Sequence, residues 1–192
     1  MRNIAEYYYR DLLTAMKSIR VTNRSARQMD FYSAIEETAY LIRTQSQAGR
    51  KVMFIGNGAS AAISSHMSTD FWKNGRIRAV AFNDSSGLTC IGNDYGYQHL
   101  FEKPIEMFAD EGDILMAISS SGRSENILRG VVAAEAKKCK IITFSGFATD
   151  NPLCSRGDIN YYVPAQTYGP VEILHHSICH CILDTMMRAD HG

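Results

Sequence analysis

The stretch that decides the fold is Ala117-Ile118-Ser119-Ser120-Ser121-Gly122-Arg123-Ser124-Glu125-Asn126, which follows the apolar run Ile114-Leu115-Met116. The order of residue types predicts a buried strand, a turn rich in hydroxyl groups, and a helix that continues to Ala136. The serines and the first N–H groups of that helix would converge at the positive end of its dipole, which suits a phosphate monoester. The alternative is a serine-rich loop with a Ser N-cap, but the position between strand and helix favours phosphate.

A second turn of this kind, Gly56-Asn57-Gly58-Ala59-Ser60-Ala61, follows the first predicted strand and opens another helix. It also satisfies a relaxed dinucleotide-binding pattern, with Asp84 at the end of the next strand as the candidate ribose-binding acid. That alternative is weaker because the chain is too short for a separate substrate domain. Parallel sheets bind ligands beyond the carboxyl ends of their strands, so one small phosphorylated ligand held by both turns explains more.

Between these turns, short apolar runs alternate with helical segments. This pattern predicts a parallel sheet covered on both faces, and hence an α/β three-layer sandwich forming a single domain over residues 1–192. The expected strands are residues 52–55, 79–82, 114–118, 141–144 and 159–163. The expected helices are residues 59–73, 98–108, 124–138 and 171–187. Residues 1–50 are predicted as two N-terminal helices, 3–20 and 29–47, joined by a connection at 21–27.

Composition and charge narrow the class of protein. The 192 residues carry a formal net charge of zero, which gives no electrostatic case for binding nucleic acid or an acidic membrane surface. No segment has the length of a membrane span, and the first twenty residues lack the apolar core of a signal peptide. Five cysteines, an odd number without paired spacing, indicate reduced thiols and a cytoplasmic protein. Cys179 and Cys181 are expected to pack in the core.

Carboxylates and imidazoles recur at helical spacing on two predicted helices. His66 and Asp70 are four residues apart, and Glu172, His176 and His180 follow at the same interval. Residues four apart share a helix face, so the two helices could meet around one ligand or one metal ion. The alternatives are a core contact for His66 and a solvated ion pair between Glu172 and His176. The joint presence of both sets favours a site.

Together these features resemble the SIS (sugar isomerase) domain, and within it the phosphoheptose isomerase group. The matching stretches are Gly56-Asn57-Gly58-Ala59-Ser60, Ile91-Gly92-Asn93-Asp94-Tyr95-Gly96-Tyr97, Glu111-Gly112-Asp113-Ile114-Leu115, Ile118-Ser119-Ser120-Ser121-Gly122 and Val163-Pro164. The resemblance implies a flavodoxin-like five-stranded parallel sheet and a homotetramer with active sites shared between subunits. It implies conversion of sedoheptulose 7-phosphate into D-glycero-D-manno-heptose 7-phosphate for surface polysaccharides. The aromatic N-terminal segment around Tyr7-Tyr8-Tyr9 is then expected at a subunit interface.

The resemblance also assigns roles to residues. Asp70 and His180 fall on the acid–base pair, and a zinc ion would be held by His66, Asp70, Glu172 and His180. The remaining positions are implied to bind the substrate: Asn57, Gly58, Ser60, Asn93, Asp94, Ser119, Ser120, Ser121, Ser124 and Glu172.

Three positions depart from the family pattern. Asp70 replaces a Glu that is one methylene longer, and Glu172 replaces a neutral Gln. The added negative charge is expected to favour a cation and to raise the pKa of a neighbouring histidine. Tyr168-Gly169-Pro170 stands where the family carries a substrate-binding Asp. Two alternatives therefore stay open: an isomerase of another ketose phosphate, and a non-catalytic phosphosugar-binding protein with a regulatory or bridging role.

Overall fold

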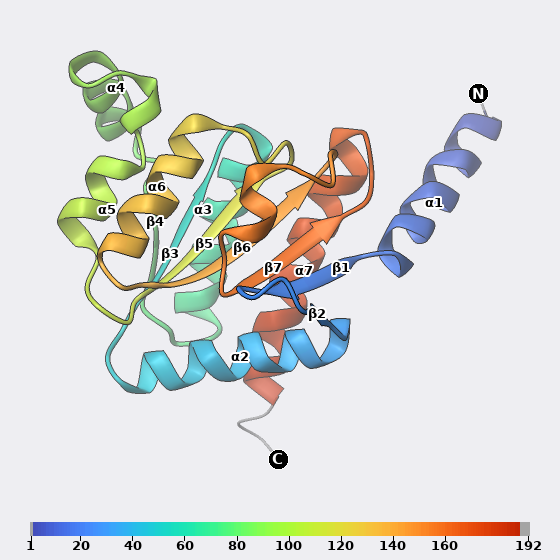
Figure 1. The fold of residues 1–192 in the computed structure, drawn as a ribbon, viewed down its shortest axis with the longest axis horizontal. Helices are drawn as coiled ribbons and strands as arrows, with labels where there is room; N and C mark the ends of the chain where they lie inside the picture. The colour runs from blue at the N-terminus through green and yellow to red at the C-terminus, as the bar shows by residue number, and fades with distance from the viewer. Residues whose placement is uncertain (1, 189–192) are drawn as a thin grey trace.

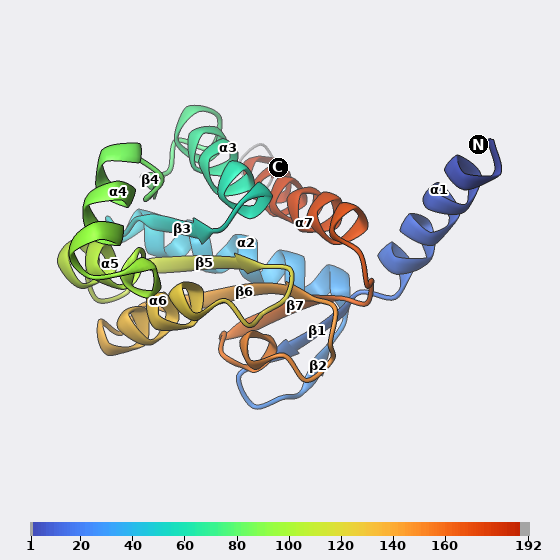
Figure 2. The same ribbon diagram turned by 90° about the horizontal axis from the view of Figure 1, so that it is seen from above.

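Five parallel strands form the centre of the computed structural model, which describes residues 2–188. They are β3 (Val52–Gly56), β4 (Ala79–Ala81), β5 (Ile114–Ser119), β6 (Lys140–Gly146) and β7 (Ile159–Val163). Their order is β7-β6-β5-β3-β4. It puts β3 and β5 side by side, and these two strands precede the predicted phosphate-binding turns at residues 56–61 and 119–124, called the phosphate turns below. The α/β class, the parallel sheet and its covered faces are confirmed (Figures 1 and 2).

The N-terminal region differs from the prediction because it contributes two strands to the sheet. β1 (Arg20–Asn23) replaces the expected end of the first helix and part of the connection, and β2 (Gln28–Met29) replaces the expected start of the second helix. β1 pairs antiparallel with β7, with Val21 opposite Tyr161, so the whole sheet has seven strands in the order β2-β1-β7-β6-β5-β3-β4. Val21 is the one fully buried residue of β1. Because its neighbours in this short strand are polar, the sequence lacks the alternation of apolar residues from which a strand is predicted.

Seven helices connect or flank the strands in the described part of the chain. They are α1 (Arg2–Lys17), α2 (Phe31–Gln47), α3 (Ala59–Lys73), α4 (Ser85–Asp94), α5 (Glu102–Phe108), α6 (Glu125–Ala136) and α7 (Tyr168–Arg188). The expected helix at 98–108 is divided into a 3-10 turn, η1 (Tyr97–His99), and α5; a second such turn, η2 (Pro152–Ser155), precedes β7. α4 was not predicted. It begins where the Asp84 carboxylate accepts a hydrogen bond from Gly87 N at 3.1 Å.

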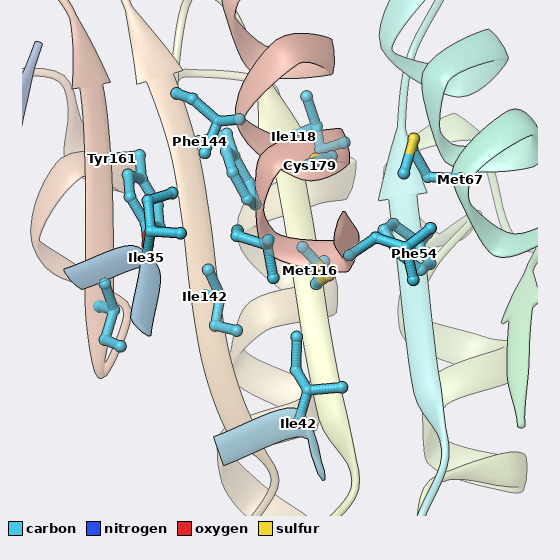
Figure 3. Close-up of a cluster of buried hydrophobic side chains, with 14 of the residues drawn as sticks. Ile35, Ile42, Phe54, Met67, Met116, Ile118, Ile142, Phe144, Tyr161 and Cys179 are labelled. Carbon is cyan, nitrogen blue, oxygen red and sulfur yellow. The ribbon is translucent and has the colours of Figure 1, made fainter. Parts of the chain in front are cut away.

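Helices α2, α3 and α7 cover one face of the sheet. Alternate strand residues point into this layer, among them Phe54, Met116 and Phe144, because successive side chains of a strand lie on opposite faces (Figure 3). Phe144 stacks on Tyr161 with ring centroids 5.3 Å apart. The buried apolar side of α7 packs into this core along the length of the helix, and α7 also contacts α3.

Helices α5 and α6 cover the other face with a second apolar cluster. Here Met53, Ile55 and Leu115 meet Val131 of α6 and Ile105 of α5. A Cβ at Gly130 would lie 2.9 Å from Ile55 Cδ1, so glycine allows α6 to approach the sheet closely. This approach sets the start of α6 directly above the end of β5.

Helix α1 projects away from the sheet in both views (Figures 1 and 2). Its exposed apolar side chains include Ile4 (70% exposed), Tyr9 (65%) and Leu13 (53%), while Ala15 near its end is buried. No helix in residues 2–188 combines the length and the apolar character needed to cross a bilayer.

Candidate active site

The two phosphate-type turns border one cavity of about 240 Å³. It lies beyond the ends of β3 and β5, where α3, α6 and α7 begin, so the sheet order brings the turns together. Ten residues line the cavity: Asn57, Gly58, Ala59, Ser60, Ser119, Ser120, Ser121, Ser124, Tyr168 and Glu172. None of these lining residues is a Lys or Arg. The positive potential for an anion therefore comes from the N-termini of helices and from N–H and O–H groups.

The serines are arranged for a ligand rather than for capping the helix. Ser124 occupies the N-cap position of α6, yet its side chain accepts no capping hydrogen bond and lies 3.5 Å from Ser119 Oγ. Ser120 Oγ is buried and has no hydrogen-bond partner among the described residues. Buried hydroxyls are normally satisfied, so an unpartnered one in the wall of a cavity indicates a missing acceptor or donor. A phosphate oxygen is an acceptor of the kind that this hydroxyl lacks.

Glycine is required at the first turn for two separate reasons. A Cβ at Gly56 would lie 2.5 Å from Ser60 O, so only glycine lets α3 start this close to β3. Gly58 has φ +55° at the N-cap of α3, a backbone conformation that L side chains seldom adopt. Ala59 and Ser60, the first residues of α3, line the cavity, and the N–H groups at this end of a helix have no intrahelical acceptor.

Helices α3 and α7 run side by side and bring together imidazoles and a carboxylate (Figure 2). His66 Nε2 lies 3.2 Å from Asp70 Oδ2, and His180 Nδ1 lies 3.9 Å from the same oxygen. The ring centroid of His176 lies 4.9 Å from that of His66 and 4.6 Å from that of His180. One ligand atom from each histidine lies within 4.8 Å of the others. These donors suit a divalent ion such as zinc.

Comparison with known proteins decides the family. A family model described as the SIS domain matches residues 25–146. A phosphoheptose isomerase from an Enterobacter species is 34% identical over 163 residues, which is 81% of this chain and 83% of that protein. One from Glaesserella parasuis is 30% identical over 185 residues, covering 92% of this chain and 95% of the relative. The chain belongs to the phosphoheptose isomerase family of SIS proteins.

Solved structures of phosphoheptose isomerases agree with this assignment. The chain superposes on the enzyme from Neisseria gonorrhoeae with a TM-score of 0.84 at 25% identity, covering 96% of this chain and 98% of that one. For the enzyme from Francisella tularensis the TM-score is also 0.84, at 26% identity and 98% coverage of both chains. The similarity includes the N-terminal helices.

In this phosphoheptose isomerase family member, Glu172 lies apart from the histidine cluster. It lines the phosphate cavity, and the group of close metal-ligand atoms contains His176 in its place. Burial raises the pKa of Glu172. The expectation that Glu172 would raise the pKa of a neighbouring histidine is wrong for His176, whose pKa is lowered by burial and by the positive charges of His180 and His66. One helical turn of about 5.4 Å separates Glu172 from His176, which accounts for the different surroundings.

Two predicted substrate-binding residues of the family motif lie elsewhere. Asn93 and Asp94 are exposed at the end of α4, where Asn93 Nδ2 donates to Asp94 Oδ1 at 2.8 Å, and neither lines the phosphate cavity. Tyr168, from the Tyr168-Gly169-Pro170 segment, does line it. Of the two cysteines expected in the core, Cys179 is buried and Cys181 is exposed, because residues two apart on a helix face nearly opposite sides.

Sequence reasoning missed two residues that hold Asn57 of the first phosphate turn in this family member. Asn126, 2% exposed, donates from Nδ2 to Asn57 Oδ1 at 2.8 Å and accepts from Asn57 Nδ2 at 2.9 Å. Tyr97 of η1 also donates to Asn57 Oδ1, at 3.1 Å. Both residues were inside quoted motifs, but nothing local in the sequence indicates that an amide near the start of α6 faces the turn after β3.

Proposed function

We propose that this chain is a cytoplasmic phosphosugar isomerase that interconverts sedoheptulose 7-phosphate and D-glycero-D-manno-heptose 7-phosphate in the synthesis of surface-polysaccharide heptose. One observation carries the proposal: a phosphate cavity and a cluster of imidazoles and a carboxylate share the same two helices. The phosphoheptose isomerases with which the chain shares its family and fold support the choice of reaction.

The spacing along the helices supports an extended sugar phosphate. Ser60 borders the cavity, and His66 follows about 9 Å further along α3. On α7, Glu172 borders the cavity and His180 lies about 12 Å further along the axis. A ligand whose phosphate is held at the helix N-termini would place its far carbons beside His66, Asp70 and His180. This distance suits the seven-carbon chain of the proposed substrate.

Isomerisation moves a proton between adjacent carbons through an enediol. Asp70 removes the proton from C1 of the ketose and returns it to C2, while His180 exchanges a proton with the carbonyl and hydroxyl oxygens. Asp70 Oδ2 approaches both His66 and His180, so one carboxylate is oriented by two imidazoles. His66 and Glu172 position the ligand on either side of this pair.

The residues present fit a divalent ion, and His176 Nε2 is buried without a hydrogen-bond partner among the described residues. By family resemblance the ion is zinc, with His66, Asp70, Glu172 and His180 as the implied ligands; Glu172 also lines the phosphate cavity. When bound, zinc would supply a Lewis acid that polarises the substrate oxygens.

The proposed assembly is a homotetramer with active sites at subunit interfaces. The support is the exposed apolar surface of α1, which projects away from its own sheet (Figure 1). Monomeric proteins seldom expose such surfaces, and a second copy of the chain would cover it.

The test is a panel of ketose phosphates incubated with purified protein, with and without added zinc. Conversion of sedoheptulose 7-phosphate in preference to shorter ketose phosphates supports the proposal. Preference for a different ketose phosphate would contradict the proposed substrate but not the proposed reaction. Tyr168 in the cavity wall would then be the first residue to examine. Phosphosugar binding without turnover on any member would favour the non-catalytic alternative.

A further inference from the structure

Phe147, the residue after β6, has a backbone conformation that bulky side chains rarely adopt. Its φ is +56°, in the left-handed region that favours glycine. Ala26, Arg76 and Lys138 also have positive φ, but they lie in the β1–β2 turn or just after α3 and α6, where this conformation is common. Phe147 follows a buried strand instead. Such strain persists only where the surroundings impose it, and it is concentrated at functional sites.

The surroundings hold the Phe147 backbone at both of its polar groups. Its N–H donates to Ala165 O at 3.1 Å. Its carbonyl oxygen accepts from the Tyr162 hydroxyl at 2.7 Å and from Gln166 Nε2 at 3.1 Å. Tyr162 belongs to β7, and Ala165 and Gln166 lie between β7 and α7. Phe147 therefore ties the end of β6 to the loop that leads into α7.

The ring of Phe147 contacts a residue of the phosphate cavity. It meets the ring of Tyr168 edge to face, with centroids 5.0 Å apart and an interplanar angle of 79°, which is a preferred aromatic geometry. Tyr168 is the first residue of α7 and lines the cavity together with Glu172, four residues further along the same helix face. Phe147 is not among the lining residues, so its ring reaches a ligand only through Tyr168.

We propose that Phe147 is a positioning residue that holds the Tyr168 ring in the wall of the phosphate cavity, where Tyr168 contacts the ligand beside its phosphate group. Tyr168 is 62% exposed, and an exposed side chain has several rotamers available. Packing against Phe147 selects one of them before the ligand arrives, which lowers the entropy cost of binding. The tyrosine ring can then pack on the carbon chain while its hydroxyl donates to a phosphate oxygen.

This placement predicts an effect on binding rather than on turnover. The phosphate cavity and the proton-transfer groups lie at different points along α3 and α7. A contact at the phosphate end is equally strong in the ground state and the transition state, so its loss raises KM and leaves kcat unchanged. The step rests on the phosphosugar ligand of the proposed function but not on isomerisation, because a protein that only binds a sugar phosphate would use Phe147 in the same way.

The experiment measures binding of sorbitol 6-phosphate, a sugar-alcohol phosphate without a carbonyl group to isomerise. Calorimetric titration compares the unmodified chain with Tyr168→Ala, Phe147→Gly and the double variant. Glycine adopts a positive φ without strain, so Phe147→Gly removes the ring and keeps the backbone path. Phe147→Tyr retains a ring at this position. Lys138→Gly is the matched control, because it relieves a φ of +57° away from the cavity. Thermal unfolding of each variant checks that the fold is retained.

Phe147→Gly should weaken binding by about threefold to tenfold, the range expected for one aromatic pair, and Tyr168→Ala by at least as much. The double variant should bind no more weakly than Tyr168→Ala alone, because Phe147 acts through Tyr168. Phe147→Tyr and Lys138→Gly should bind as the unmodified chain does. In turnover of a ketose phosphate, Phe147→Gly should raise KM by the same factor and leave kcat unchanged.

Additive losses in the double variant would overturn the proposal, since Phe147 would then act on the cavity independently of Tyr168. Unchanged affinity in Phe147→Gly, or no binding of sorbitol 6-phosphate by the unmodified chain, would overturn it as well. The expected pattern of losses in a protein that turns over no ketose phosphate would uphold this proposal and refute only the isomerase function.

Discussion

Asn57 and Asn126 exchange two side-chain amide hydrogen bonds, of 2.9 and 2.8 Å, across the gap between the two phosphate turns. Each amide uses both a donor and an acceptor, which fixes its orientation. Asn57 belongs to the turn after β3 and Asn126 to the first turn of α6, so the pair holds the two anion-binding helix starts at a constant separation. A rigid spacing matters for the proposed function, in which both turns contact one phosphate.

Removing this connection should weaken ligand binding more than it alters the fold. In Asn126→Ala the Asn57 amide loses both hydrogen bonds to Asn126 and keeps the one from Tyr97, at a cost of about 1–3 kcal/mol in the free energy of unfolding. The KM for the phosphosugar should rise at least tenfold while kcat changes less, because the proton-transfer groups lie elsewhere. Asn160→Ala is the matched control: this buried amide accepts from Thr143 Oγ1 at 2.8 Å, and its loss should reduce stability alone. Equal KM values in the two variants would contradict the role assigned to Asn126.

The unpartnered hydroxyl of Ser120 predicts a loss of ligand affinity without a loss of stability. Ser120→Ala should leave the stability of the free protein nearly unchanged, since no protein hydrogen bond is lost. Affinity for the phosphosugar should fall by about 1.5–3 kcal/mol, the value of a hydrogen bond to a charged group. Calorimetric titration with a phosphosugar and thermal unfolding measure the two quantities. Ser68→Ala, whose Oγ donates to Ser65 O on the same helix as Ser60, should leave affinity unchanged. Unaltered binding in Ser120→Ala would remove this residue from the site.

The proton-transfer pair predicts loss of turnover with retention of binding. Asp70→Asn keeps the size of the side chain but cannot accept the proton, and should lower kcat by about a hundredfold to ten-thousandfold. His180→Ala should lose turnover as well. Affinity for the phosphosugar, measured by calorimetry, should change little in either variant because the phosphate cavity is intact. Wild-type turnover in Asp70→Asn would refute the mechanism.

The buried Tyr161 predicts alkaline sensitivity. Its hydroxyl donates to Ala34 O at 2.9 Å and lies 2.8 Å from Thr38 Oγ1, and burial raises its pKa despite the Thr38 contact. A raised pKa means that the folded state holds the proton more tightly. The stabilising contribution is complete below the unfolded value of about 10 and is lost as the pH rises above it.

Chemical denaturation at several pH values tests this. Tyr161→Phe should be less stable than the unmodified protein near neutral pH, and the difference should shrink above pH of about 10. Tyr32→Phe, which changes an exposed tyrosine on α2, should follow the unmodified protein throughout. A constant difference between Tyr161→Phe and the unmodified protein at all pH values would contradict the prediction.

The exposed side of α1 predicts self-association. Sedimentation at micromolar concentration should give a tetramer, and Leu13→Glu should shift it to smaller species because a charge would be buried in the interface. Lys140→Glu, at an exposed strand end, is the control and should not change the assembly. A monomeric unmodified protein would refute the assembly through α1.

The sequence predicted the features that depend on neighbouring residues and missed those that depend on contacts between distant segments. The turn at Ser119–Ser124 and the start of α3 at Ala59 were predictable because glycine, hydroxyl and apolar residues occur there in a fixed local order. β1 was not, since only Val21 is buried and its partner β7 is distant in sequence. His176 could be placed on a face of α7, but which neighbours it meets depends on how α7 crosses α3. The amide pair of Asn57 and Asn126 was hidden for the same reason.

The outermost strands of the sheet are its shortest, β2 with two residues and β4 with three. A strand of this length offers too few free N–H and C=O groups to template another chain, and natural proteins use such short edges against aggregation. Growth of the sheet from one molecule into the next is therefore disfavoured at both ends. Concentrated solutions of this protein should resist amyloid-like polymerisation, and association must proceed through helical surfaces.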